Sequence, residues 1–172
     1  MTYLGKLKAS GIPIGWSALL VGWDGVDGHG RLVSSEEVKA YAAEQLEFVG
    51  APHYSEVLAL AGANPSDEEG IRRALSTLAE CDREIRADGV RPWRLLLLKE
   101  TIQELDEDPL YDLIRLTEFW ASFDYPTDMP HVAQGVGNRI SPTEYYTESM
   151  LKQSIHRHLE WIEKEERILR QT

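Results

Sequence analysis

The residues with the clearest potential for chemistry lie in one segment without helical periodicity, residues 124–140. This segment contains His131 together with Tyr125, Asn138 and Arg139, from which a pocket for a small ligand could be built. A histidine acts as a general base only when a second group positions it, and the sequence does not pair His131 with one. The alternative, which we favour, is that these polar groups and the neighbouring glycines satisfy a tight, buried turn.

The remaining histidines and the cysteine lack the spacing of a metal or nucleophilic site. His156 and His158 lie two residues apart in a helical pattern, so their side chains point roughly 200° from one another and cannot share a metal. His158 falls on the apolar stripe, which predicts a hydrogen-bonded core histidine. Cys81 is the only cysteine, which excludes an internal disulfide and cysteine-based zinc ligation. Phosphate-loop, serine-elbow and His-Glu-x-x-His motifs are absent from the sequence, so we predict no enzyme, catalytic residue, metal or cofactor.

A glycine-rich segment, residues 25–36, partly matches a calcium-binding loop. With Gly25 as position 1, Asp27 and Glu36 stand at positions 3 and 12, where such loops carry oxygen ligands. Positions 1 and 5 are Gly25 and His29, which removes two of the side-chain ligands that a hard cation requires. The pattern therefore favours a glycine-rich turn that leads into a helix.

The chain is acidic, with 29 acidic and 18 basic side chains and a net charge of −11. Such a field repels phosphate backbones, so direct nucleic-acid binding is disfavoured. Apolar runs stay well below the roughly 18 residues of a membrane span, so no membrane association is expected. The acidic excess lies between residues 34 and 130, where it is either a solvated surface or a face that attracts a basic protein partner.

Helical periodicity and helix start signals run through most of the chain. Pro92 and Asp108-Pro109 place proline in a first helical turn, and the apolar stripe after Pro109 begins with Leu110. Gly50 and Pro52 predict the end of an earlier helix. Capping boxes, in which a serine and a glutamate three residues later satisfy each other's backbone N–H groups, mark three further starts: Ser34 with Glu37, Ser66 with Glu69, and Ser141 with Glu144.

These elements predict a single all-α domain over residues 1–172, a bundle or array of about six to seven helices with a long loop before the C-terminal helix. Residues 1–33 are ambiguous, because Tyr3 to Leu7 could form a short strand and the segment around Trp16 one or two helical turns. The charged start is followed by Gly11-Ile12-Pro13 rather than an apolar core, which predicts no signal peptide and a cytoplasmic location.

Several aromatic and turn motifs resemble those of a known family. They are Trp93 to Leu98, Phe119-Trp120, Phe123, Tyr125-Pro126, Gly137-Asn138 and Pro142-x-x-Tyr145-Tyr146. In these features the chain resembles a bacterial domain-of-unknown-function family of small acidic proteins associated with polymorphic toxin and contact-dependent growth inhibition loci. The resemblance implies an immunity protein with a toxin as its partner, and it carries over no catalytic residue.

We therefore expect an immunity protein that binds and neutralises a cognate protein toxin, such as a basic nuclease, through an acidic surface. Two alternatives remain: a small enzyme or ligand-binding protein with a pocket formed by residues 124–140, and a helical scaffold. The residues expected to bind the partner are Glu100, Glu104, Asp106, Glu107, Asp108, Asp112, Asp124 and Asp128.

Overall fold

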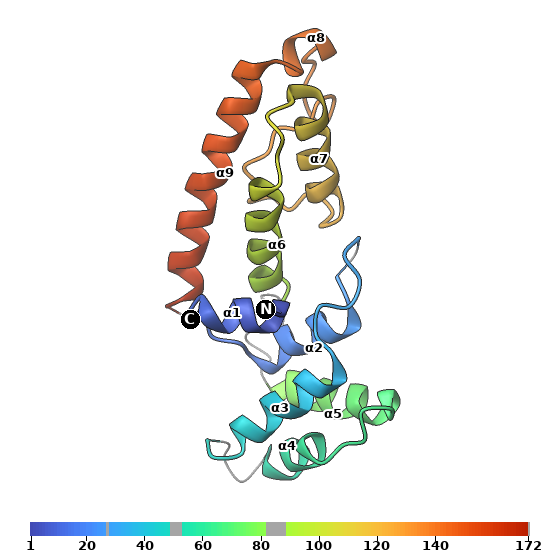
Figure 1. Ribbon diagram of the computed structural model, residues 1–172. Helices are drawn as coiled ribbons and strands as arrows, with labels where there is room; N and C mark the ends of the chain where they lie inside the picture. Colours follow the sequence, from blue (N-terminus) through green and yellow to red (C-terminus); the bar gives the residue numbers. More distant parts are fainter. Residues whose placement is uncertain (27, 49–52, 82–88, 172) are drawn as a thin grey trace. The chain divides into compact units, whose positions relative to one another are not determined.

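The computed structural model describes residues 1–26, 28–48, 53–81 and 89–171. In these ranges the chain forms nine helices and no strand beyond one isolated bridge, which confirms the all-α prediction (Figure 1). The helices are α1 (Tyr3–Ala9), α2 (Trp16–Asp24), α3 (Ser35–Gln45), α4 (Tyr54–Ala61), α5 (Glu68–Cys81), α6 (Arg91–Gln103), α7 (Pro109–Ala121), α8 (Pro142–Tyr145) and α9 (Glu148–Leu169).

The helix count exceeds the predicted six to seven for two reasons. Residues 1–33 form α1 and α2, so the alternative of a strand at Tyr3 to Leu7 is wrong. The capping box at Ser141 starts only the single turn α8, and Thr147 then caps α9 separately by accepting a hydrogen bond from the Met150 N–H. The predicted end of α3 at Gly50 and Pro52 lies outside the described residues; α3 itself ends at Gln45.

Two compact units make up the chain, Met1–Trp93 (the N-terminal unit) and Arg94–Thr172 (the C-terminal unit). Each has its own buried apolar side chains. Those of the N-terminal unit include Leu19, Val38, Leu60 and Ile71. The sequence-based assignment of one domain over residues 1–172 stays a prediction beside this division into units.

The helix starts of the N-terminal unit follow the predicted caps in one case and not in another. At α3, the Ser34 side chain accepts from the Glu37 N–H at 3.2 Å and the Glu37 carboxylate accepts from the Ser34 N–H at 2.9 Å, which confirms that capping box. The box predicted at Ser66 is wrong. Asp67 caps α5 instead, with its carboxylate accepting from the Gly70 N–H at 3.0 Å, because Asn64 engages the Ser66 N–H in the preceding turn.

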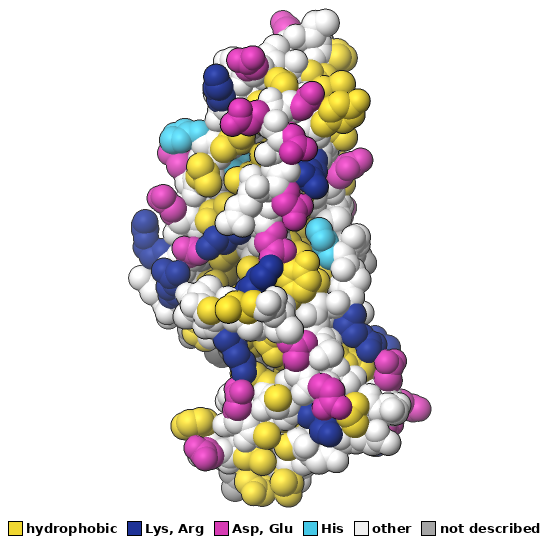
Figure 2. All heavy atoms as spheres, in the orientation of Figure 1, with side chains coloured by type: hydrophobic (Ala, Val, Ile, Leu, Met, Phe, Trp, Pro, Cys, Tyr) yellow, Lys and Arg dark blue, Asp and Glu magenta, His cyan; other side chains and the backbone are white. Residues whose placement is uncertain are grey.

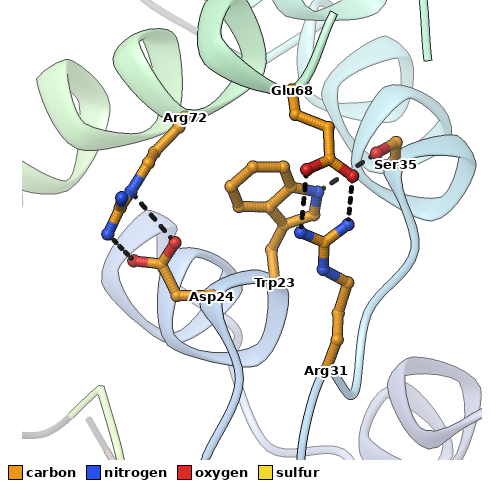
Figure 3. A network of polar contacts seen from close by, with 6 residues as sticks. All are labelled: Trp23, Asp24, Arg31, Ser35, Glu68 and Arg72. Carbon is orange, nitrogen blue, oxygen red and sulfur yellow. Dashed lines mark hydrogen bonds and ion pairs between the residues drawn. The ribbon is translucent and has the colours of Figure 1, made fainter. Parts of the chain in front are cut away.

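Two arginine–carboxylate pairs tie α5 to the α2 region of the N-terminal unit (Figure 3). Arg31 binds both oxygens of Glu68, at 2.9 and 3.5 Å, while its guanidinium lies 4.4 Å from the centroid of the Trp23 ring. Arg72 likewise binds both oxygens of Asp24, at 3.1 and 3.2 Å. Such exposed pairs contribute little energy individually, but their paired geometry fixes the orientation of α5.

Between α2 and α3 lies the predicted glycine-rich turn. The Val26 and Gly30 backbones exchange hydrogen bonds of 3.0 Å, and Gly25 and Gly30 both have positive φ values that side-chain-bearing residues rarely adopt. Asp27, the calcium-ligand candidate, lies outside the described residues. Gly22 accepts from the Leu32 and Val33 N–H groups as the chain leaves the turn, so the segment is closed by backbone bonds.

In the C-terminal unit, α6, α7 and α9 pack around aromatic side chains. Asp108 caps α7 by accepting from the N–H groups of Leu110 and Tyr111, as predicted for a helix that starts at Pro109. Pro92 stands in the first turn of α6 as predicted, although that position belongs to the N-terminal unit. Among the buried side chains of the C-terminal unit are Leu113, Leu116, Trp120, Tyr145 and Leu151.

Candidate functional site

Residues 124–140 are held to α7 and α9 by a buried polar network centred on His131. Its Nε2 lies 2.8 Å from the Thr117 hydroxyl and 3.2 Å from the Tyr145 hydroxyl, and its Nδ1 lies 3.4 Å from the Ser154 hydroxyl. Tyr145 donates its proton to the Val132 carbonyl at 2.6 Å. His131 is only 3% exposed, so this network lies inside the unit.

A second histidine, His158, extends the same network along α9. Its Nε2 accepts from the indole N–H of Trp120 at 2.8 Å, which leaves Nδ1 protonated and 2.6 Å from the Ser154 carbonyl oxygen. The Ser154 hydroxyl lies 3.4 Å from His131 and 3.5 Å from His158. The prediction of a hydrogen-bonded core histidine at position 158 is confirmed.

Burial keeps both histidines neutral. It lowers the pKa of His131 from 6.5 to about 3, and two further effects act in the same direction: the repulsion that protonation of both His131 and His158 would create, and the positive charge of Arg157. It lowers the pKa of His158 to about 4, against a hydrogen bond to Ser154 that acts in the opposite direction. The Tyr145 pKa is raised, also chiefly by burial. A neutral, enclosed network of this kind is suited to fixing a loop in place.

The other residues of the candidate pocket have different surroundings. The Asn138 side-chain amide donates to the carbonyls of Ala133 and Val136, and its oxygen accepts from the N–H groups of Gly135 and Ile140. These four bonds use both the nitrogen and the oxygen of the Asn138 side-chain amide within its own turn.

Tyr125, four residues after the end of α7, has a positive φ of 46°, and Arg139 is exposed. The contacts around His131 and Asn138 agree with the interpretation of a turn whose polar groups are satisfied. His131 is buried, but Gly135, Val136 and Gly137 are exposed, so the glycine turn itself does not lie in the interior. The alternative pocket stays a prediction.

The eight acidic residues predicted to bind a partner all belong to the C-terminal unit. Glu104 pairs with Arg115 at 3.3 Å, and Asp128 pairs with Arg94 at 2.9 Å. Arg94 is itself buried, with its guanidinium 5.3 Å from the centroid of the Trp161 ring. Asp128 therefore also anchors residues 124–140 to α6.

Asp112 is the predicted partner-binding residue that does not lie on the surface. It is 2% exposed, and one of its oxygens accepts from the Asp106 N–H at 3.2 Å. The other oxygen is buried without a hydrogen-bond partner among the described residues. Asp112 thus stabilises the turn between α6 and α7 through this buried hydrogen bond.

Four exposed acids lie close in sequence at the α6–α7 turn, including Glu104, which pairs with Arg115. We call Glu104, Asp106, Glu107 and Asp108, together with Leu110 and Tyr111 of α7, the acidic turn. Tyr111 is 69% exposed and Leu110 is 43% exposed, beside Asp108 at the start of the helix. In Figure 2, acidic side chains also outnumber basic ones over the part of the view that α7, α8 and α9 occupy.

Sequence reasoning missed the two apolar members of the acidic turn. Leu110 begins the apolar stripe of α7 in the sequence, yet it is partly exposed because the first turn of the helix extends beyond the core. Tyr111 is one residue further along, about 100° off that stripe, and this offset is the signal that could have placed it on the surface.

Among the residues that the structure describes, no cluster of three or more histidine, cysteine or acidic side chains has a geometry that could hold a metal ion. Likewise, none of the described helices combines the length and apolar character required to cross a bilayer.

The fold and these sites define an all-α protein with an enclosed histidine network and an exposed acidic turn. Residues 4–166 match a family described as "Uncharacterized protein conserved in bacteria (DUF2247)", and the chain belongs to this bacterial family. Neither the curated proteins nor the solved structures contain a match to the chain.

Proposed function

We propose that this chain is a cytoplasmic immunity protein that binds and neutralises a basic protein toxin through the acidic turn. The observation that supports the proposal most directly is the exposure of Tyr111 and Leu110 beside the exposed carboxylates of Asp106, Glu107 and Asp108. The link to toxin loci comes from the sequence resemblance, and the net charge of −11 has the sign that a basic partner requires.

The arrangement of the acidic turn suits fast and tight association. Carboxylates that project from one turn attract a basic surface over roughly one Debye length, about 8–10 Å, and so raise the association rate. An exposed tyrosine beside these carboxylates contributes large contact area at low conformational cost, and tyrosine is enriched among the residues that dominate binding energy. Charge would then set the rate of encounter, and Tyr111 the lifetime of the complex.

The test is rescue of cells that express the toxin encoded beside the gene, followed by kinetics on the purified complex. Combined Asp106→Asn, Glu107→Gln and Asp108→Asn changes should slow association at least ten-fold at low salt and much less at high salt. Asparagine at position 108 keeps a good helix cap, so α7 should stay intact. Failure of the wild-type chain to rescue would refute the immunity role.

A matched control removes the same charge elsewhere. Glu47, Glu69 and Glu80 are exposed in the N-terminal unit. Their replacement by glutamine removes three negative charges, as many as the acidic-turn variant removes. If this control slowed association as much as the acidic-turn variant, the effect would come from net charge and the proposed surface would be wrong.

Tyr111→Ala tests the anchor separately. It should leave the association rate nearly unchanged and speed dissociation about 30-fold, which corresponds to roughly 2 kcal/mol at a central interface residue. Leu159→Ala, at an exposed apolar position on α9, should leave both the association rate and the dissociation rate unchanged. An unchanged dissociation rate for Tyr111→Ala would remove that residue from the interface.

A further inference from the structure

The N-terminal unit contains a hollow between α4 and α5 with a volume of about 390 Å³. On α4 it is lined by Glu56, Ala59, Leu60 and Ala63, whose spacing places them on one face of the helix and its extension. Leu60 is fully buried, so the accessible apolar surface on this side comes from the two alanines. This side of the hollow is therefore an apolar wall with one carboxylate at its end.

The α5 side has a similar composition. Ile71 is fully buried, and Ala74 and Gly70 lie beside it along the lining. The Asp67 carboxylate lies directly over Gly70, where a Cβ atom would be 2.2 Å from its Oδ2. Glycine at this position leaves room for a second carboxylate at the hollow.

The charges around the hollow are unequal. Glu56 and Asp67 contribute two carboxylates, and Arg73 is the one basic residue in the lining. Glu56 accepts a hydrogen bond from the neighbouring Ser55 hydroxyl at 2.7 Å, and both side chains belong to the lining. An occupant that neutralises this lining carries a positive charge beside its apolar part.

The surface next to the hollow is apolar as well. Tyr54 and Leu58 are exposed on α4 and stand one residue before the lining residues Ser55 and Ala59. A volume of about 390 Å³ falls at the lower end of the range for ligand sites and exceeds what one aliphatic side chain fills. The space fits a short stretch of peptide.

We propose that the α4–α5 hollow binds a peptide segment of a protein partner, with a leucine-like side chain against Ala59, Ala63 and Ala74 and an adjacent lysine or arginine paired with Glu56. Burial of the aliphatic group supplies the affinity, and the carboxylates select the basic neighbour. This site lies in the N-terminal unit and does not depend on the immunity role or on the acidic turn.

Short blocked peptides test the proposal on the full-length protein by nuclear magnetic resonance. Acetyl-leucyl-lysine amide should shift amide signals of residues 55–77 saturably, with a Kd of roughly 1–10 mM for so small a probe. Acetyl-leucyl-glutamate amide and acetyl-glycyl-lysine amide should each bind at least ten-fold more weakly. Equal binding of the lysine and glutamate peptides would overturn the assigned occupant, and so would shifts that do not saturate.

Two variants locate the site. Ala59→Leu fills the hollow from an exposed helical position and should abolish the shifts, whereas Ala40→Leu, the same change at an exposed position of α3 outside the lining, should leave them intact. Glu56→Gln should reduce the preference for lysine over glutamate at least three-fold, and Glu69→Gln should not. Binding that survives Ala59→Leu would place the peptide elsewhere and refute the proposal.

Discussion

Acidification from pH 7 to pH 5.5 should destabilise the protein through its two buried histidines. His131 and His158 have pKa values of about 3 and about 4 in the folded protein, because burial penalises the charged imidazolium, against 6.5 when the chain is unfolded. Below pH 6.5 the unfolded chain therefore binds protons that the folded protein excludes. The stability is fully present above the unfolded pKa and is lost as the pH falls from there toward the folded values.

The size of the effect follows from the unfolded pKa alone, as long as the folded values stay well below the working pH. Each histidine then lowers the free energy of unfolding by about 1.2 kcal/mol between pH 7 and pH 5.5, and the pair by about 2.5 kcal/mol. The lowered pKa of His29, caused by partial burial, adds in the same direction. Carboxylates such as Glu37 and Glu144, whose pKa values are lowered from 4.5, act only at lower pH.

The assay is urea unfolding at both pH values, for the wild-type chain and for His131→Asn and His158→Gln variants. With a urea dependence of about 2 kcal/mol per molar, the wild-type midpoint should fall by roughly 1 M at pH 5.5. Each variant should lose about half of this fall, because one proton-linked group is gone. Glutamine at position 158 retains an oxygen that can accept from the Trp120 N–H, so the variant should fold.

Two results would refute this reasoning. One is a urea midpoint that is the same at pH 7 and pH 5.5. The other is a ring-proton resonance of His131 or His158 in the folded protein that titrates near pH 6.5, which would show that the imidazole reaches solvent. Either outcome would reopen the alternative of an accessible pocket in residues 124–140.

Three further predictions concern stability, measured by the same urea unfolding. Asp112→Asn keeps the oxygen that accepts a backbone N–H and removes a buried charge, so it should stabilise by about 1 kcal/mol; a lower midpoint would show that the charge is compensated. Gly22→Ala places a Cβ 2.5 Å from an indole carbon and should lower the free energy of unfolding by about 1–3 kcal/mol. Gly62→Ala meets nothing closer than 3.5 Å and should raise the free energy of unfolding by about 0.4–1 kcal/mol. Equal effects of the two changes would contradict the packing. Ser34→Ala should cost about 1 kcal/mol and Ser66→Ala under about 0.5 kcal/mol, and a larger loss at Ser66 would restore the predicted box there.

The acidic turn unites a structural and a proposed binding role in adjacent residues. Asp108 caps α7 and Asp112 braces the turn from below, while Asp106 and Glu107 are exposed. Glu107 has a positive φ of 64°, a conformation that costs about 1 kcal/mol for a residue with a side chain. Only the exposed acids are free to meet a partner without disturbing the helix, which is why the binding test uses a cap-preserving asparagine at position 108.

Local signals in the sequence were sufficient where a helix start depends on neighbours in the chain. The capping box at Ser34 and the cap at Asp108 are confirmed, because both involve bonds that span three residues or fewer. The prediction at Ser66 is wrong, since Asn64 accepts from the Ser66 N–H and Asp67, one residue later, caps the helix; the sequence pattern does not distinguish Ser66 from Asp67 as the cap. Leu110 follows the apolar period, but its exposure depends on where the core ends.

The sequence by itself determined the all-α class, the acidic character and most helix starts, because composition and short-range hydrogen bonding decide these properties. Only the tertiary structure decided the surroundings of the candidate residues. It brings His131 to Thr117, Tyr145 and Ser154 across separations of 14 to 23 residues, and it buries Asp112 beneath the α6–α7 turn. Contacts between residues distant in the chain depend on how helices pack, and a periodic pattern specifies which face of a helix is buried without specifying what that face meets.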